Sequence, residues 1–125
     1  MRKGERMATV NKIIETVDGM VPNTCEEETK FRWMAELDGM VAKQVMRLPE
    51  PPRYEYPRDM DRQFLIPEPY ERVYELYMEA MIDLSNRDYH GYNNVITVFD
   101  AMFSKYRNEY IQDNRPVGAG NFKNW

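Results

Sequence analysis

A proline-rich segment divides this chain into two helix-forming parts. Residues 49–69, PEPPRYEYPRDMDRQFLIPEP, hold six of the eight prolines, and proline lacks the backbone donor that a helix interior needs. At about 20 residues the segment is longer than most connections in compact domains. Its aromatic residues Tyr54, Tyr56 and Phe64 are of a type that disordered segments usually lack. We therefore expect a short extended pair or a docked loop, with these three rings available to a partner.

Two helices are predicted before the proline-rich segment. Thr9 or Asn11 can cap a short first helix that ends near Gly19. Its apolar residues recur at helical spacing and are Val10, Ile13, Ile14 and Val17. The second helix, within residues 23–48, has Asn23 and Thr24 as candidate caps and three glutamates in its first turn, where the helix dipole favours anions. Glu26 with Lys30 and Glu28 with Arg32 are predicted ion pairs at four-residue spacing. The main apolar stripe of this helix consists of Met34, Leu37, Val41, Val45 and Leu48.

Two further helices, over residues 70–86 and 92–114, are predicted to form an antiparallel hairpin. One face of the first contains Tyr70, Val73, Tyr74, Tyr77, Met81 and Leu84. The matching face of the second contains Tyr92, Val95, Ile96, Phe99, Met102, Phe103, Tyr106 and Tyr110. Leu76 and Ile82 fall off the first face, which indicates either a second buried face for a partner or packing against the first two helices. The fold class is thus all-α, a bundle of about four helices with a long Pro-rich loop and an extended C-terminal tail.

The length and charge of the chain exclude several classes of protein. A chain of 125 residues suits one domain, which we place at residues 7–114. The formal net charge of −4 argues against wrapping nucleic acid or binding anionic lipid. The single cysteine cannot form an intrachain disulfide, and no apolar run suits a membrane span or a signal peptide. We expect a soluble protein of a reducing cytoplasm.

The two ends of the chain differ from this domain. Residues 3–6 can be encoded by a purine-rich run that resembles a ribosome-binding site, so we expect residues 1–6 to be an upstream extension and Met7 to be the start. Residues 115–125 have no period. We expect them to be a flexible tail that becomes ordered on a partner, with Arg115, Phe122 and Trp125 in contact.

Groups that carry catalysis or hold metals are scarce. His90 is the only histidine, so the chain alone builds no two-histidine metal site or proton relay. Glycine-rich phosphate loops and nucleophile elbows are absent from the sequence. We expect no enzyme activity, no cofactor and no metal site. The row Glu71, Glu75, Glu79 and Asp83, at four-residue spacing, indicates either a solvated face or a surface for a basic partner.

Three segments together resemble a known family. They are TVNKIIETVD, KFRWMAELDGMV and the hairpin PYERVYELYMEAMIDLSNRDYHGYNNVITVFDAMFSKY. The sequence resembles small head-tail connector proteins, also called head-completion or adaptor proteins, of tailed phages and prophages of Gram-positive bacteria. The positions that carry most of the resemblance are Pro69, Tyr70, Tyr77, Asp83, Tyr92, Asn93, Asn94 and Phe99.

The resemblance implies a structural virion protein that forms a ring of about a dozen copies. Such a ring would dock on the portal protein, receive a tail-completion protein, and let DNA pass through its channel without specific binding. An acidic subunit suits that channel, since cations in the lumen would hold phosphates. The protein would be made in the cytoplasm of the bacterial host and end in the virion. Asn93 and Asn94 would either cap the last helix or contact the next subunit.

A different class of function stays open. The chain also suits a small phage or bacterial helical protein that binds one protein partner in a regulatory or scaffolding role, through its carboxylate row and tail. A DNA-binding repressor is opposed by the net charge and by the lack of a basic recognition helix.

Overall fold

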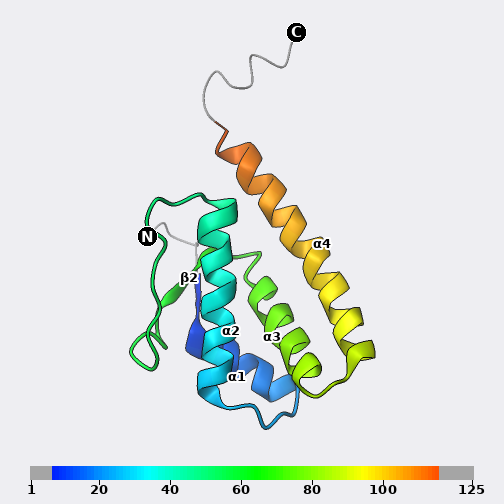
Figure 1. Ribbon diagram of the computed structural model, residues 1–125. Coiled ribbons are helices and arrows are strands. Elements are labelled where there is room, and N and C mark those ends of the chain that lie inside the picture. The colour runs from blue at the N-terminus through cyan, green and yellow to red at the C-terminus, as the bar shows by residue number, and fades with distance from the viewer. Residues whose placement is uncertain (1–6, 116–125) are drawn as a thin grey trace.

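The protein is mostly helical, as predicted, with a two-stranded sheet beside the helices (Figure 1). The computed structural model describes residues 7–115. Its elements in chain order are β1 (Met7–Thr9), α1 (Val10–Met20), α2 (Glu27–Met40), the π-helical turn η1 (Val41–Val45), β2 (Gln63–Pro67), α3 (Arg72–Ser85) and α4 (Tyr89–Asp113). The sheet corrects the all-α prediction, although the class is predominantly helical.

Helix α3 lies at the centre of the fold, where it contacts α1, α2 and α4. Its buried residues are Val73, Tyr74, Leu76, Met78, Ala80 and Ile82. Leu76 and Ile82 are 4% and 0% exposed, so of the two predictions for these residues, packing against the first helices is correct. They present no second apolar face to a partner. Leu84 was predicted to be in the core but is exposed.

The first helix forms as its sequence predicts. The Thr9 hydroxyl oxygen accepts a hydrogen bond from the Lys12 backbone N–H at 3.2 Å, which caps α1. The four apolar residues predicted to face the core, Val10, Ile13, Ile14 and Val17, are all buried.

The start of the second helix differs from the prediction. Helix α2 begins at Glu27 without a side-chain cap, so neither Asn23 nor Thr24 caps it. The Asn23 side chain instead accepts hydrogen bonds from the Cys25 N–H and the Lys30 ammonium. Lys30 is buried and pairs with Asp18 of α1 at 2.8 Å, whereas the predicted Glu28–Arg32 pair forms at 3.2 Å. A tertiary ion pair has thus taken the place of a predicted local pair.

The sheet joins two segments that lie far apart in the sequence. Strands β1 and β2 are antiparallel, with Met7 opposite Pro67 and Thr9 opposite Gln63, and the register shifts between these pairs. Within β2, Phe64 and Ile66 are buried while their neighbours are not, as expected when alternate side chains point to opposite faces. The sheet therefore ties the end of the proline-rich connection to the start of α1.

The turn between α3 and α4 is closed by Asp88. Its carboxylate accepts a hydrogen bond from the Gly91 N–H at 2.9 Å, and α4 begins at Tyr89, earlier than the predicted Tyr92. A Cβ at Gly91 would lie 2.5 Å from the Asp88 carboxylate and 2.9 Å from that of Asp83, so a larger residue there would displace these carboxylates. The capping prediction for Asn93 and Asn94 is wrong, since both are exposed beyond the first turn.

Helix α4 lies on the outer side of α3, and its C-terminal half runs past the start of α3 (Figure 1). Only Phe99 and Tyr106 of its 25 residues are buried. Tyr77 of α3 contacts the Phe99 ring at 5.4 Å between centroids, and Phe99 stacks on Phe103. The predicted aromatic face of this helix is therefore packed on α3, but most of its rings stay partly accessible.

Candidate partner-binding surface

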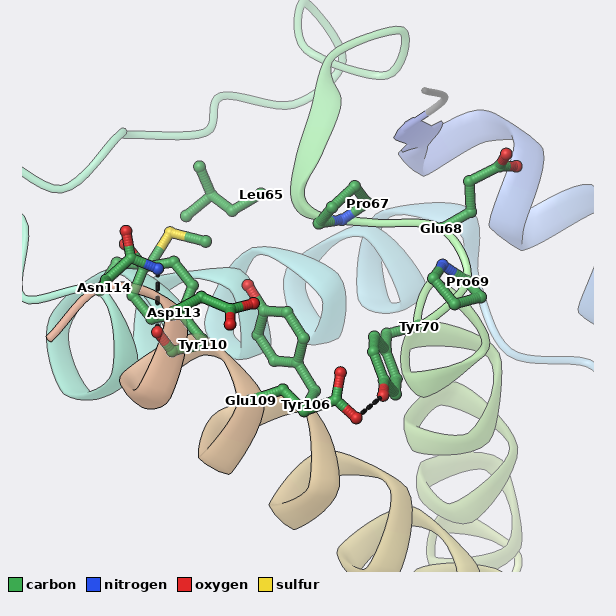
Figure 2. Close-up of a pocket in the computed structure, with 11 residues that line it drawn as sticks. Leu65, Pro67, Glu68, Pro69, Tyr70, Tyr106, Glu109, Tyr110, Asp113 and Asn114 are labelled. Atoms are coloured by element: carbon green, nitrogen blue, oxygen red, sulfur yellow. Dashed lines mark hydrogen bonds between the residues drawn. The ribbon is translucent and has the colours of Figure 1, made fainter. Parts of the chain in front are cut away.

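A groove of about 350 Å³ lies between the C-terminal half of α4 and the segment that leads from β2 into α3 (Figure 2). Its lining residues, which we call the α4 groove, are Met46, Leu65, Pro67, Glu68, Pro69, Tyr70, Tyr106, Glu109, Tyr110, Asp113 and Asn114. They come from the end of η1, from β2, from the β2–α3 connection and from the last two turns of α4.

Two prolines and a tyrosine form one side of the α4 groove. Pro67 ends β2, and Pro69 precedes Tyr70. Because each proline disfavours helical backbone at the residue before it, α3 begins only after the residues of this connection that line the groove. The Tyr70 hydroxyl donates a hydrogen bond to the Glu109 carboxylate at 2.5 Å, across to α4 (Figure 2). This bond raises the pKa of Tyr70, because it favours the protonated hydroxyl. It fixes the connection to α4 at one point and leaves the groove open beside it.

Tyrosine rings on α4 form the floor of the groove. Tyr106 is 5% exposed, and its ring contacts Tyr70 at 5.4 Å and Tyr110 at 6.1 Å between centroids. Burial raises the pKa of Tyr106 to about 12, with smaller effects from Tyr110 and Asp38. The Tyr106 hydroxyl therefore keeps its proton at physiological pH, and the floor of the groove is aromatic with polar edges.

Two more hollows border the same half of α4. One, of about 630 Å³, lies between η1 and the end of the helix, where Arg47, Ile111 and Arg115 line it together with groove residues such as Tyr110. The other, of about 450 Å³, lies on the far side of Tyr70 and is lined by Pro69, Tyr70, Val98, Ala101, Met102 and Lys105. Val98 and Ile111 are about half exposed. The C-terminal half of α4 is thus bordered by open apolar surface on several sides.

The charges around these hollows are separated. Glu68, Glu109 and Asp113 line the α4 groove, whereas Arg47 and Arg115 line the hollow beside it. An apolar floor with a charged, accessible rim is the usual composition of a protein–protein interface. The rim carboxylates favour a partner segment that brings a cation.

A buried carboxylate holds the proline-rich connection in place. Asp38 of α2 is 0% exposed. It accepts hydrogen bonds from the hydroxyls of Tyr54 and Tyr74, the latter at 2.5 Å, and from the Leu65 N–H at 3.1 Å. Burial raises the pKa of Asp38, although the three donors and Arg62 oppose the shift. Burial and the adjacent Asp38 also raise the pKa of Tyr54 and of Tyr74, so both hydroxyls keep their protons.

Further contacts fasten the middle of the connection to α2. The Tyr56 hydroxyl donates to the Glu27 carboxylate at 2.7 Å, and the Tyr56 ring lies 5.3 Å from that of Phe31. The Arg62 guanidinium lies 4.9 Å from the Tyr54 ring centroid and donates to the Arg53 carbonyl at 2.7 Å. The connection is docked on its own chain, and Tyr54 and Tyr56 are half-buried there.

The predicted partner residue Phe64 lies in the core. It is 1% exposed and stacks on Tyr74 with 3.9 Å between ring centroids. The prediction that its ring contacts a partner is wrong for this structure, because alternation along β2 points the side chain inward.

The other predicted residues are distributed over different places. Glu75 and Glu79 of α3 and Glu71, directly before it, are half-buried, and Glu75 pairs with Arg72 at 3.1 Å. Their row is therefore neither fully solvated nor an open acidic surface. Arg115 is exposed beside the hollow at the end of α4. Phe122 and Trp125, and with them the predicted tail, lie outside the described residues.

Asp38 and Glu109 were not predicted as functional residues from the sequence. A signal for Asp38 was present, since it lies four residues after Met34 and three before Val41, on the apolar stripe of its helix. An acid at such a position needs a buried partner. Glu109 gave no comparable signal, because its neighbours on α4 are polar and aromatic alike.

Comparison with protein-family models, with curated proteins and with solved structures found no match for this chain. Within residues 7–115, no group of three histidine, cysteine, aspartate or glutamate side chains is placed to hold a metal ion. No helix among these residues combines the length and the apolar character that crossing a membrane requires.

Proposed function

We propose that this protein is a structural virion protein that joins a phage head to its tail as a ring of subunits. In this proposal the ring sits on the portal protein, offers its far side to a tail-completion protein, and surrounds DNA without binding it specifically. The protein acts by assembly and not as an enzyme.

The observation that carries the proposal is the position of the residues on which the family resemblance rests. Tyr77, Asp83, Tyr92 and Phe99 lie in the α3–α4 hairpin, where Tyr77 and Phe99 are in ring contact. Pro69 and Tyr70 line the α4 groove. The positions that carry most of the resemblance thus lie in one hairpin and in the surface beside it, whereas the two shorter matching segments lie in α1 and α2.

The uneven coverage of α4 also supports the proposal. A subunit of a ring needs apolar surface that its own fold does not cover. Helix α4 is bordered by hollows from its middle to its C-terminal end, and Val98 near its middle and Ile111 near its end are half exposed. Neighbouring subunits that packed on this part of α4 would bury these side chains.

Native mass spectrometry of the purified protein, alone and mixed with the portal protein of the same genome, tests the proposal. We expect a complex of about a dozen copies on the portal, visible by electron microscopy as a stacked ring. The double variant Val98→Asp/Ile111→Asp should not join this complex. Glu15→Lys on α1, an exposed position away from α4, is the matched control and should assemble normally.

A monomer or dimer that the portal leaves unchanged would contradict the proposal. Capture of one other protein at a one-to-one ratio would then favour the regulatory or scaffolding class. Normal assembly of the α4 double variant with an intact portal complex would keep the ring but move its interface away from α4.

A further inference from the structure

We propose that the α4 groove of one copy binds the C-terminal segment, residues 116–125, of a neighbouring copy. This inference rests on the proposed ring, and it names the occupant of a surface that the proposed function leaves open. The groove and the segment both present aromatic side chains, and their charges are opposite. The length of the segment allows it to extend to another copy.

The groove presents apolar side chains inside a carboxylate rim. Tyr106 and Tyr110 lie on its floor, and Met46 and Leu65 line its wall. Glu68, Glu109 and Asp113 supply three carboxylates and no cation lies among the lining residues. The Tyr70 hydroxyl satisfies part of Glu109, whereas Asp113 is exposed at the end of the helix. Such a site favours an aromatic segment that carries a positive charge.

The segment PVGAGNFKNW has this composition. Phe122 and Trp125 are its large apolar side chains, and Lys123 is its only charged side chain. Aromatic residues with one cation among them are suited to an aromatic floor with a carboxylate rim. Apart from Pro116, Val117 and Asn121, the residues before Phe122 are glycine or alanine. They form a spacer with few side-chain atoms.

The length of the segment allows it to contact a neighbouring copy. Residue 115 precedes a proline, which disfavours helical backbone there. Ten extended residues span at most about 35 Å. That reach is close to the length of the 25-residue helix α4, about 37 Å.

Isotope-coded photocrosslinking tests the inference on the full chain. Phe122 is replaced by p-benzoylphenylalanine, which keeps an aromatic ring at that position, and the variant is mixed with ¹⁵N-labelled wild-type protein, with and without portal protein. After irradiation, mass spectrometry identifies the crosslinked peptides. We expect crosslinks from light to heavy peptides that contain Met46 or Tyr110. A matched control places the same photocrosslinker at Lys12, an exposed position on α1, and should give no crosslinks to the groove.

A charge exchange tests the same contact independently. Asp113→Lys and Lys123→Glu should each lower the yield of crosslinks between copies by about threefold, the effect of one accessible ion pair. The double variant, which restores opposite charges, should return the yield to that of the wild type. Asp100→Lys, exposed on α4 but outside the groove, controls for net charge and should have no effect.

The outcomes separate this inference from the proposed function. Crosslinks between copies in the groove support the inference. A ring on the portal without such crosslinks overturns the inference and leaves the ring intact. If the segment crosslinks only to groove peptides that are themselves unlabelled, it binds the groove of its own chain. That result also overturns the inference. Crosslinks from residue 122 to portal protein alone assign the segment to the portal. Absence of both ring and groove crosslinks overturns the inference and the proposed function together.

Discussion

Helix α4 has a larger share of aromatic residues than α3, six of 25 compared with two of 14, but it is much less buried. Six of the 14 residues of α3 are buried, compared with two of the 25 residues of α4. Helix α3 contacts three other helices, whereas α4 packs mainly on α3 and makes a smaller contact with η1. The position of a helix in the bundle therefore decides its burial here, and aromatic content does not.

This difference gives the aromatic residues two roles. On α3, Tyr74 is fully buried, and its hydroxyl bonds both the Asp38 carboxylate and the Ile66 N–H. On α4, Tyr106 and Tyr110 form the floor of a groove that opens to solvent. The first role stabilises the fold, and we assign the second to assembly. Substitutions in the two helices and in the turn between them test this division.

Loss of the carboxylate that holds Tyr74 should have the largest effect on stability. Asp38→Ala leaves two tyrosine hydroxyls and the Leu65 N–H without their acceptor, and we expect it to lower the free energy of unfolding by about 4 kcal/mol. Asp38→Asn keeps one acceptor oxygen and should lose less. Urea denaturation followed by circular dichroism measures both. A loss below about 1 kcal/mol for Asp38→Ala would show that the network is not needed for the fold.

Matched truncations on the two helices compare them directly. Leu76→Ala on α3 removes a side chain that is 4% exposed and should cost about 3 kcal/mol through lost burial and the cavity that remains. Ile111→Ala on α4 removes one that is 50% exposed and should change stability by less than about 0.5 kcal/mol. Thermal and urea unfolding of the two variants side by side provide the measurement. Equal losses would contradict the division between the helices.

The hairpin turn should give an intermediate effect. Asp88→Ala removes the carboxylate that accepts from the Gly91 N–H at the start of α4 and should cost about 1 kcal/mol. Asn93→Ala changes an exposed residue and should leave the unfolding midpoint where it is. If Asn93→Ala were the more destabilising of the two, Asp88 would not be the effective cap.

The smallest effect is expected away from both helices, at the ion pair of Asp18 and Lys30. Partial burial opposes ionisation of Asp18, but hydrogen bonds from Lys30 and Asn23 outweigh it and lower its pKa below the ordinary 3.8. A lowered pKa in the folded state stabilises the protein above pH 3.8, and this contribution is lost as the pH falls through the folded value. Because Asp18 is 42% exposed, we expect less than about 1 kcal/mol.

Lys30→Met isolates this contribution. The difference in unfolding free energy between pH 6 and pH 3 should be smaller in the variant than in the wild type, and Lys12→Met, which removes an exposed lysine of α1, should leave the difference unchanged. Identical pH dependence in Lys30→Met and the wild type would show that the pair does not titrate with folding.

Local sequence signals predicted much of this fold. The Thr9 cap, the apolar stripe of α1 and the pairing of α3 with α4 depend on residues within a few turns of one another. The errors occurred where distant residues compete with local ones. Lys30 was predicted to pair with Glu26 of its own helix but pairs with Asp18 of α1. Leu84 follows the helical period of the apolar face, but it lies near the end of α3 and is exposed there.

The sheet and the groove could not be predicted in the same way. Strand β1 has three residues and no alternation to detect, and its partner lies more than fifty residues away. The α4 groove arises because the end of η1, the prolines after β2 and the last turns of α4 meet in space. Tyr70 and Tyr106 were identified as apolar-face residues, but only the tertiary arrangement shows that they border an open surface.

The hydrogen bonds of β2 also restrict how any partner can attach. The consecutive backbone amides of Leu65 and Ile66 donate to the side chains of Asp38 and Tyr74, so they are not available to an added strand. Exposed strand edges are common routes to β-augmentation and to aggregation, and here two side chains from α2 and α3 block that route at these positions. A partner that reaches the neighbouring groove must therefore be recognised through its side chains, which makes the contact selective for sequence.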